Sequence, residues 1–364
     1  MNQKKSDLKK AQAKAKRASE QVNRRIEELG GLTNKLNQQL TEIQRVFDEI
    51  RGISSEEELQ LLELKKIRLN WVHQVEKIEA DYRDIEIKAS GFGAIGVGTG
   101  IAVAALGPTV TMGVATTFGV ASTGTAISAL SGAAATNAAL AWLGGGTLVA
   151  GGSGIVGGEL LVALTGPLGL GMALIAAIGA GICFFSAKTD KKRLKNIFTA
   201  VGNRDARSMK LAIVELEERI NRIGNETKLL SDAIIEAKGF GTDYDTMTDQ
   251  QQYELISFVN LMHSSTQLLV NPILGLQPKF TNTDLNRYFE KARELGPSKK
   301  LQDIMVALGN LLFKIKLDDT DKKVLWKAIR GNKNFIKAAE IKKKEFKFDI
   351  FQETLNALEL KNKS

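Results

Sequence analysis

The chain is poor in the residues that build metal centres and covalent crosslinks. It has one cysteine, Cys183, and two histidines, His73 and His263, among 364 residues. A single thiol cannot form an internal disulfide, and this ligand set is too small for a structural zinc site. We therefore expect a reducing compartment and no cofactor. Neither histidine has a carboxylate or nucleophile at a catalytic spacing, so we do not expect an enzyme.

Charge is absent from one long internal segment. Between Lys88 and Lys188 the only charged side chain is Glu159, and 23 of the 34 glycines lie there. Charged residues make up 25% of the whole chain, so the remainder is densely charged. A soluble domain distributes charge over its exposed surface, so about a hundred residues with one charge must be buried by protein or by lipid. We call residues 89–187 the insert.

Aromatic residues are also scarce, at 6%. The chain has no zinc-finger spacing and no aromatic RNA-binding signature. Its formal net charge of +9 nevertheless favours an anionic partner. A lipid surface is the favoured partner, and nucleic acid is the weaker alternative. The first twenty residues lack the apolar run of a secretory signal peptide, so we expect the chain to reach a membrane through the insert.

Two long amphipathic helices are predicted before the insert. Apolar residues step by threes and fours through residues 22–50, the pattern of a coiled-coil seam. This seam consists of Val22, Ile26, Leu29, Leu36, Leu40, Ile43, Phe47 and Ile50, with Thr33 in one polar position. Ser54 followed by three glutamates predicts the start of a second helix, whose seam covers residues 64–85. The short turn predicts an antiparallel hairpin, and Gly30 with Gly31 predicts a local break, because each glycine lowers helix stability by about 1 kcal/mol.

A third amphipathic helix is predicted after the insert, with a seam through residues 206–238. It begins with a basic collar, which consists of Lys188, Lys191, Lys192, Arg193 and Lys195. The tail from residue 242 onward contains short helical stretches separated by turn residues, and strand signals are poor throughout. We interpret the tail as a small helical domain.

The predicted fold class is therefore all-α. Long antiparallel coiled-coil helices flank a Gly/Ala-rich, membrane-inserting helical hairpin, and a small helical C-terminal domain follows. The predicted units are residues 1–88 for the N-terminal coiled-coil helices, 89–187 for the insert, 188–240 for the basic collar and third helix, and 241–364 for the C-terminal domain.

Residues 168–186 are the best transmembrane candidate in the insert. These nineteen residues have no charge and end next to the basic collar. At about 1.5 Å per residue they span close to the roughly 30 Å hydrocarbon core, and the collar would lie on the cytoplasmic face. Residues 91–106 are shorter and residues 109–143 are less hydrophobic, so we expect two spans and leave four open.

Small residues recur every four positions in the insert, a spacing that lets membrane helices pack closely. The candidate packing residues are Gly96, Gly100, Gly124, Gly132, Gly154, Gly158, Ala177 and Gly181. Burial in a soluble Ala/Gly-rich core is the alternative explanation. Glu159 is a candidate pore-lining or gating residue, because an acid at membrane depth must be neutral, paired or hydrated. It can equally mark a loop between two spans.

Two ligand-binding motifs are present in part and are discounted. Residues 91–96 match G-x-G-x-x-G, but a predicted helix precedes them and no acidic residue follows at the spacing of a dinucleotide site. The carboxylates spaced like a calcium loop are Asp243, Asp245, Asp249 and Glu254. Met247 and Thr248 replace a ligand and the turn glycine of that loop, so we expect Thr248 or Asp249 to cap a helix.

The run GTAISALSGAAATNAALAWLGGGTLVAGGSGIVGG, residues 124–158, resembles the membrane segments of the small interferon-inducible, mitochondrion-associated proteins and of bacterial glycine-zipper proteins. This resemblance implies membrane association and a role in defence or cell death. The layout, a hydrophobic helical insert between long amphipathic helices, is similar to that of the α-helical pore-forming toxins. The resemblance implies a segment that is hidden in a soluble form and exposed on membranes.

The sequence predicts a membrane-inserting effector that forms a homo-oligomer through its seams and permeabilises a bilayer, as a toxin or an abortive-infection protein does. We expect it on the cytoplasmic face of a membrane, reached from a soluble cytoplasmic form, with the C-terminal domain sensing or binding a regulatory protein. One alternative is a permanently anchored coiled-coil scaffold. The other is a soluble coiled-coil protein that binds nucleic acid.

Overall fold

The computed structural model describes residues 2–54, 56–69, 71–72, 188–270, 279–331, 336 and 341–363. The whole insert lies outside the described residues. The regular elements are α1 (Asn2–Asp48), a helix at residues 56–69, α8 (Lys188–Gly239), a short 3-10 turn η4 (Tyr244–Thr246), α9 (Asp249–Val270), α10 (Asn282–Ala292), α11 (Lys299–Leu312), α12 (Asp319–Gly331) and α14 (Phe348–Lys363). Every element in this described part is helical, which confirms the all-α class.

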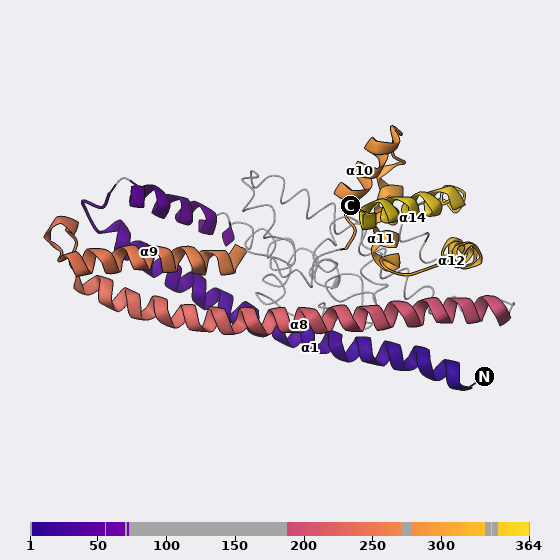
Figure 1. Ribbon diagram of the computed structural model, residues 1–364, viewed down its shortest axis with the longest axis horizontal. Coiled ribbons are helices and arrows are strands. Elements are labelled where there is room, and N and C mark those ends of the chain that lie inside the picture. Colours follow the sequence, from indigo (N-terminus) through magenta and orange to yellow (C-terminus); the bar gives the residue numbers. More distant parts are fainter. Residues whose placement is uncertain are drawn as a thin grey trace, which may run out of the picture.

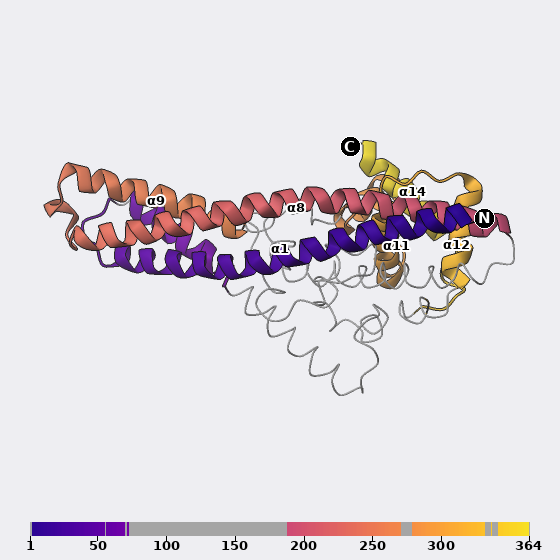
Figure 2. The same ribbon diagram turned by 90° about the horizontal axis from the view of Figure 1, so that it is seen from below.

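The two longest helices, α1 and α8, lie side by side and run in the same direction (Figures 1 and 2). Arg25 forms an ion pair with Glu217 at 2.8 Å, and Lys238 forms one with Glu42 at 2.6 Å. The partners are 192 and 196 positions apart in the sequence. This separation stays nearly constant along the pair, so the helices are parallel. We call the paired helices α1 and α8 the stalk.

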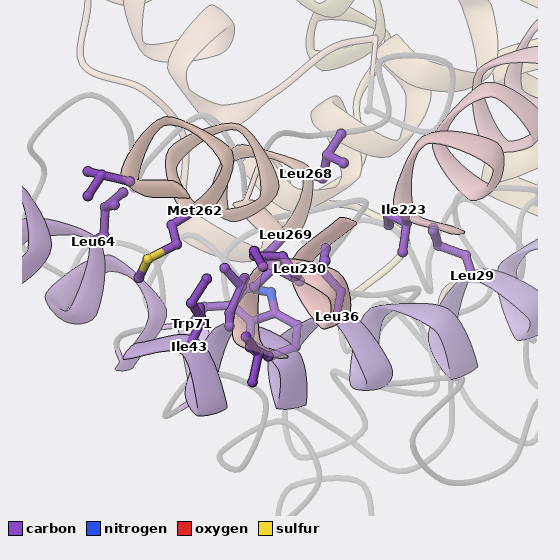
Figure 3. Packing of buried hydrophobic residues seen from close by; sticks show 14 of the residues in the cluster. Leu29, Leu36, Ile43, Leu64, Trp71, Ile223, Leu230, Met262, Leu268 and Leu269 are labelled. Carbon is purple, nitrogen blue, oxygen red and sulfur yellow. The ribbon is translucent and has the colours of Figure 1, made fainter. Parts of the chain in front are cut away.

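The stalk is held together by apolar residues that α1 and α8 bury in one core. Buried residues of the α1 seam are Val22, Leu29, Leu36, Leu40, Ile43 and Phe47, and those of the α8 seam are Ala212, Leu216, Ile220, Ile223, Leu230 and Ile234. Figure 3 shows Leu29 facing Ile223, and Leu36 beside Leu230. Each seam therefore finds its apolar partner within the same chain.

Each stalk helix continues into a shorter helix that folds back along it. Lys65 pairs with Asp48 at 2.7 Å, so the helix at residues 56–69 returns along α1. Arg219 donates to the carbonyl oxygen of Leu268 at 2.7 Å, so α9 returns along α8. The four helices share one hydrophobic core, which we call the first core.

The two turns of these hairpins are joined to each other. The backbone N–H of Arg51 donates to the carbonyl of Thr242, and the N–H of Tyr244 donates to the carbonyl of Arg51, both at 2.9 Å. Gly52 has φ of 80° and Gly241 has φ of 89°, a left-handed conformation that glycine adopts without steric strain. The stalk is thus closed at this end by backbone hydrogen bonds.

A second core forms around the opposite end of α8. The helices α10, α11, α12 and α14 share a hydrophobic core there with one apolar face of α8, made by Leu194, Ile197, Phe198 and Val201, and α12 packs directly against α8. Each core therefore combines helices from distant parts of the chain. The start of α8 packs with the C-terminal helices, whereas α9 packs with the N-terminal ones.

The predicted break at Gly30 and Gly31 is absent, and α1 continues through both residues. A Cβ at Gly31 would meet nothing within 4 Å, so this glycine serves no close approach. The buried seam residues on either side, Leu29 and Leu36, hold the helix against α8. Burying one leucine contributes roughly 1.5–3 kcal/mol, which exceeds the helix penalty of one glycine.

We predict opposite effects of alanine at two kinds of glycine. Gly31→Ala and Gly224→Ala add a methyl group in open space within helices, so each should raise the free energy of unfolding by about 0.5–1 kcal/mol. Gly309→Ala should lower it, because the new Cβ would overlap the ring of Phe280. Chemical denaturation followed by circular dichroism measures all three. Destabilisation by Gly31→Ala would contradict a continuous α1.

Candidate functional site

Both stalk helices begin with a dense group of basic residues, and the two groups lie at the same end. Because α1 and α8 are parallel, both begin at the end opposite the hairpin turns (Figures 1 and 2). Exposed cations there are Lys10, Lys14 and Arg17 of α1, and Lys188 and Lys192 of α8. The insert joins α8 at this end, directly before Lys188. We call this region the basic end, and it is the candidate functional site.

The opposite end, at the hairpin turns, is acidic. Its carboxylates are Asp48, Glu49, Glu56, Glu57, Glu58, Asp243, Asp245 and Asp249, which outnumber the neighbouring cations Arg45, Arg51, Lys65 and Lys238. The stalk is therefore electrically polarised along its length. An anionic surface would be attracted to the basic end and repelled from the turns.

The predicted basic collar is divided between two roles. Lys188 and Lys192 are exposed, and Lys191 and Lys195 are half-buried. Arg193 instead pairs with Asp318 and Asp321 of α12, each at 2.7 Å. Hydrogen bonds from Arg193 lower the pKa of Asp318, and those carboxylates raise the pKa of Arg193. Arg193 thus attaches the second core to α8, whereas the four lysines face outward in full or in part.

Arg204 forms a second attachment between α8 and the C-terminal helices. Its guanidinium donates to the carbonyl oxygens of Leu311 at 2.8 Å and of Phe313 at 2.6 Å. These carbonyls lie at the C-terminus of α11, where the last turn has no helical partners of its own. A cation at this position also complements the negative end of the helix dipole.

Asp205 lies beside Arg204, and its charge is poorly compensated. It pairs with Arg204 at 2.8 Å, yet its Oδ2 is buried without a hydrogen-bond partner among the described residues. Burial raises the pKa of Asp205 to about 6, although the neighbouring Arg204 acts in the opposite direction. Sequence reasoning missed this pair, because Asn203, Arg204 and Asp205 form a polar run typical of an exposed helix face.

Most predicted site residues cannot be placed. All the small packing residues of the insert and Glu159 lie outside the described residues. Within the described helices, none combines the length and the apolar character that crossing a membrane requires. The residues spaced like a calcium loop cap short helical segments instead. The side chain of Asp243 accepts a hydrogen bond from the N–H of Asp245, and the side chain of Thr248 accepts one from the N–H of Gln251.

We predict a pH-dependent contribution from Asp205. Its pKa in the folded state lies above the ordinary value of 3.8, so the folded protein binds this proton more tightly than the unfolded chain. The contribution of Asp205 to stability should therefore rise as the pH falls from about 6 to about 4. Thermal denaturation of Asp205→Asn and of the unaltered protein checks this. As the pH falls from about 6 to about 4, the Tm of the unaltered protein should rise relative to the Tm of the variant. A constant difference in Tm would contradict the assignment.

No protein-family model, curated protein or solved structure matches this chain.

Proposed function

We propose that this protein is a membrane-inserting effector, in which the insert enters and perturbs a bilayer while the helical bundle carries it. One observation supports this above all others: residues 89–187 contain a single charged side chain and two thirds of the glycines, inside a chain whose other parts are densely charged. Such a segment needs an apolar environment.

The ends of the connection that contains the insert lie far apart on the stalk. The described part of the second helix stops at Val72, and its Trp71 is buried in the first core with Leu36 and Leu230 (Figure 3). The chain resumes at Lys188, at the basic end. At 1.5 Å per residue, the stretch of α8 between these levels is about 60 Å long. The connection that contains the insert therefore leaves the described bundle near Leu230 and rejoins it at the basic end.

The position of the lysines supports an anionic lipid surface as the partner. Lys188, Lys191 and Lys192 lie on the first turn of α8, immediately after the uncharged segment. Each cation near an anionic membrane surface contributes about 1 kcal/mol of attraction. The acidic turns lie at the far end of the stalk, so the charges favour one orientation on the membrane.

The seams already have apolar partners within one chain. Residues 22–50 and 206–238 bury their apolar faces against each other within one chain. If the protein oligomerises, as the sequence predicts, it must use another surface while the stalk remains assembled. The C-terminal helices pack beside the junction of the insert with α8, which suits the proposed sensing role.

Dye release from liposomes tests the proposal. We expect the full-length protein to release dye from anionic vesicles, and a variant that lacks residues 91–186 to release none. Residues 73–90 remain in this variant between Val72 and Lys188, which lie about 60 Å apart along α8. A flexible linker of about twenty further residues, each up to about 3.3 Å long when extended, keeps that connection free of strain. Circular dichroism of the variant should show that the bundle still folds.

The outcomes separate the candidate functions. Leakage by the full-length protein alone supports a permeabilising effector. Vesicle binding without leakage supports the anchored scaffold instead. Neither binding nor leakage by the full-length protein contradicts both.

We predict that the collar lysines strengthen vesicle binding because of their location and not merely their charge. Replacing Lys188, Lys191 and Lys192 together by Gln should weaken binding to anionic vesicles at least about tenfold. The matched control replaces Lys35, Lys210 and Lys228, which are exposed elsewhere on the stalk, and changes the net charge equally. A vesicle flotation assay measures both. Equal losses would contradict a specific role for the basic end.

A further inference from the structure

The outward face of the helix at residues 56–69 carries three exposed leucines. Leu59, Leu62 and Leu69 are 67%, 54% and 53% exposed. Single exposed leucines are common on protein surfaces, but here three lie on one short helix. We call Leu59, Leu62, Lys66 and Leu69 the leucine stripe.

The stripe lies opposite the buried face of the same helix. Its members are spaced by three and four residues, so they follow one side of the helix. The buried positions Leu61, Leu64 and Arg68 point into the bundle, where Arg68 donates to Thr41 at 2.7 Å. The stripe is therefore the second apolar face of a helix whose first face already has its partner.

Charge along this helix is arranged in two halves. Glu56, Glu58 and Glu63 are exposed in the first part, and Lys66 is exposed near the end. If a second copy of the same helix lies antiparallel to it, the acidic half of each meets the basic half of the other. A parallel pair would place like charges side by side, which destabilises helix pairs.

We propose that the leucine stripe is a self-association surface, on which a second copy of this chain binds antiparallel about a two-fold axis. With Leu59 of one copy opposite Leu69 of the other, Leu62 lies opposite Lys66, and Glu63 lies next to that lysine. The apolar stem of Lys66 covers Leu62 while its ammonium reaches the carboxylate. A two-fold interface of this kind is closed, because every contact occurs twice.

The interface is small, which determines when it forms. A helix of fourteen residues buries less area than the roughly 1,200–2,000 Å² of a stable complex. Association should therefore depend strongly on concentration. If the proposed function holds, attachment of the insert to a membrane confines the chains and raises their effective concentration, so that the stripe pairs them there.

Thiol crosslinking tests the pairing and its direction. In a Cys183→Ala background, Leu59→Cys and Leu69→Cys are prepared separately and treated with a short bifunctional thiol reagent, alone and as an equal mixture. Antiparallel pairing places residues 59 and 69 of different copies together, and two copies of residue 59 about 15 Å apart. We expect crosslinked dimer in the mixture and little in either variant alone.

Leu211→Cys provides the control for random collision, since Leu211 is equally exposed at 67% but lies on α8. The proposal would be overturned if the mixture gave no more crosslinked dimer than Leu211→Cys gives. It would also be overturned if Leu59→Cys alone and Leu69→Cys alone gave as much dimer as the mixture. The reaction is run at rising protein concentration without lipid and then on vesicles. Crosslinking without lipid supports self-association through the leucine stripe even if the protein does not insert into membranes. Failure of the stripe and failure of the proposed function can therefore be told apart.

A charge test examines the register. Leu62→Lys places a cation opposite Lys66 of the second copy, whereas Leu62→Glu places a carboxylate there. In sedimentation, we expect Leu62→Lys to abolish the concentration-dependent dimer and Leu62→Glu to retain more of it. Leu211→Lys is the control, because it adds the same charge outside the leucine stripe and should leave the dimer unchanged. Equal effects of Leu62→Lys and Leu62→Glu would contradict this register.

Discussion

The parallel pairing of α1 and α8 is the constraint on which the rest of the structure depends. Two seams from distant parts of the sequence bury their apolar residues against each other, and the ion pairs Arg25–Glu217 and Lys238–Glu42 maintain one register along the stalk. This pairing aligns the two hairpin turns, so that Arg51 can bind Thr242 and Tyr244. It also brings the cationic beginnings of both helices to one end, which produces the electrical polarity of the molecule.

A parallel pair cannot be closed by a short turn, because its second helix must begin where the first one began. Antiparallel helices need only a few residues between them, whereas parallel helices need a long crossover. Here the crossover consists of the returning helix at residues 56–69 and the long segment that contains the insert. The uncharged residues thus belong to this long crossover. This arrangement is consistent with a bundle that stays folded while its crossover enters another environment.

Much of the helical framework could be predicted from the sequence. The features that could not be predicted depend on contacts between distant parts of the chain. The steps of three and four through Val22, Leu29 and Leu36 mark the buried face of α1, because helix periodicity is local. The partner of that face is not local: an equally good seam elsewhere in the chain was predicted to bind another protomer. The break at Gly30 and Gly31 followed from helix propensity, which tertiary burial outweighs. Arg204 was missed because the carbonyls that it binds lie at the end of α11, about a hundred residues away, and Asp205 was missed with it as part of the same polar run. The predicted glycine rows and Glu159 stay predictions.

Hydrogen–deuterium exchange in the presence and absence of anionic vesicles tests the central claim most directly, because it reports on the insert and on the stalk in one experiment. The account predicts that amides of residues 89–187 become protected when vesicles are added, while the seam amides of α1 and α8 keep the slow exchange they have in solution. Unchanged exchange in residues 89–187 would contradict insertion. Faster exchange along α1 and α8 would show that the stalk opens, and would contradict a bundle that carries the insert intact.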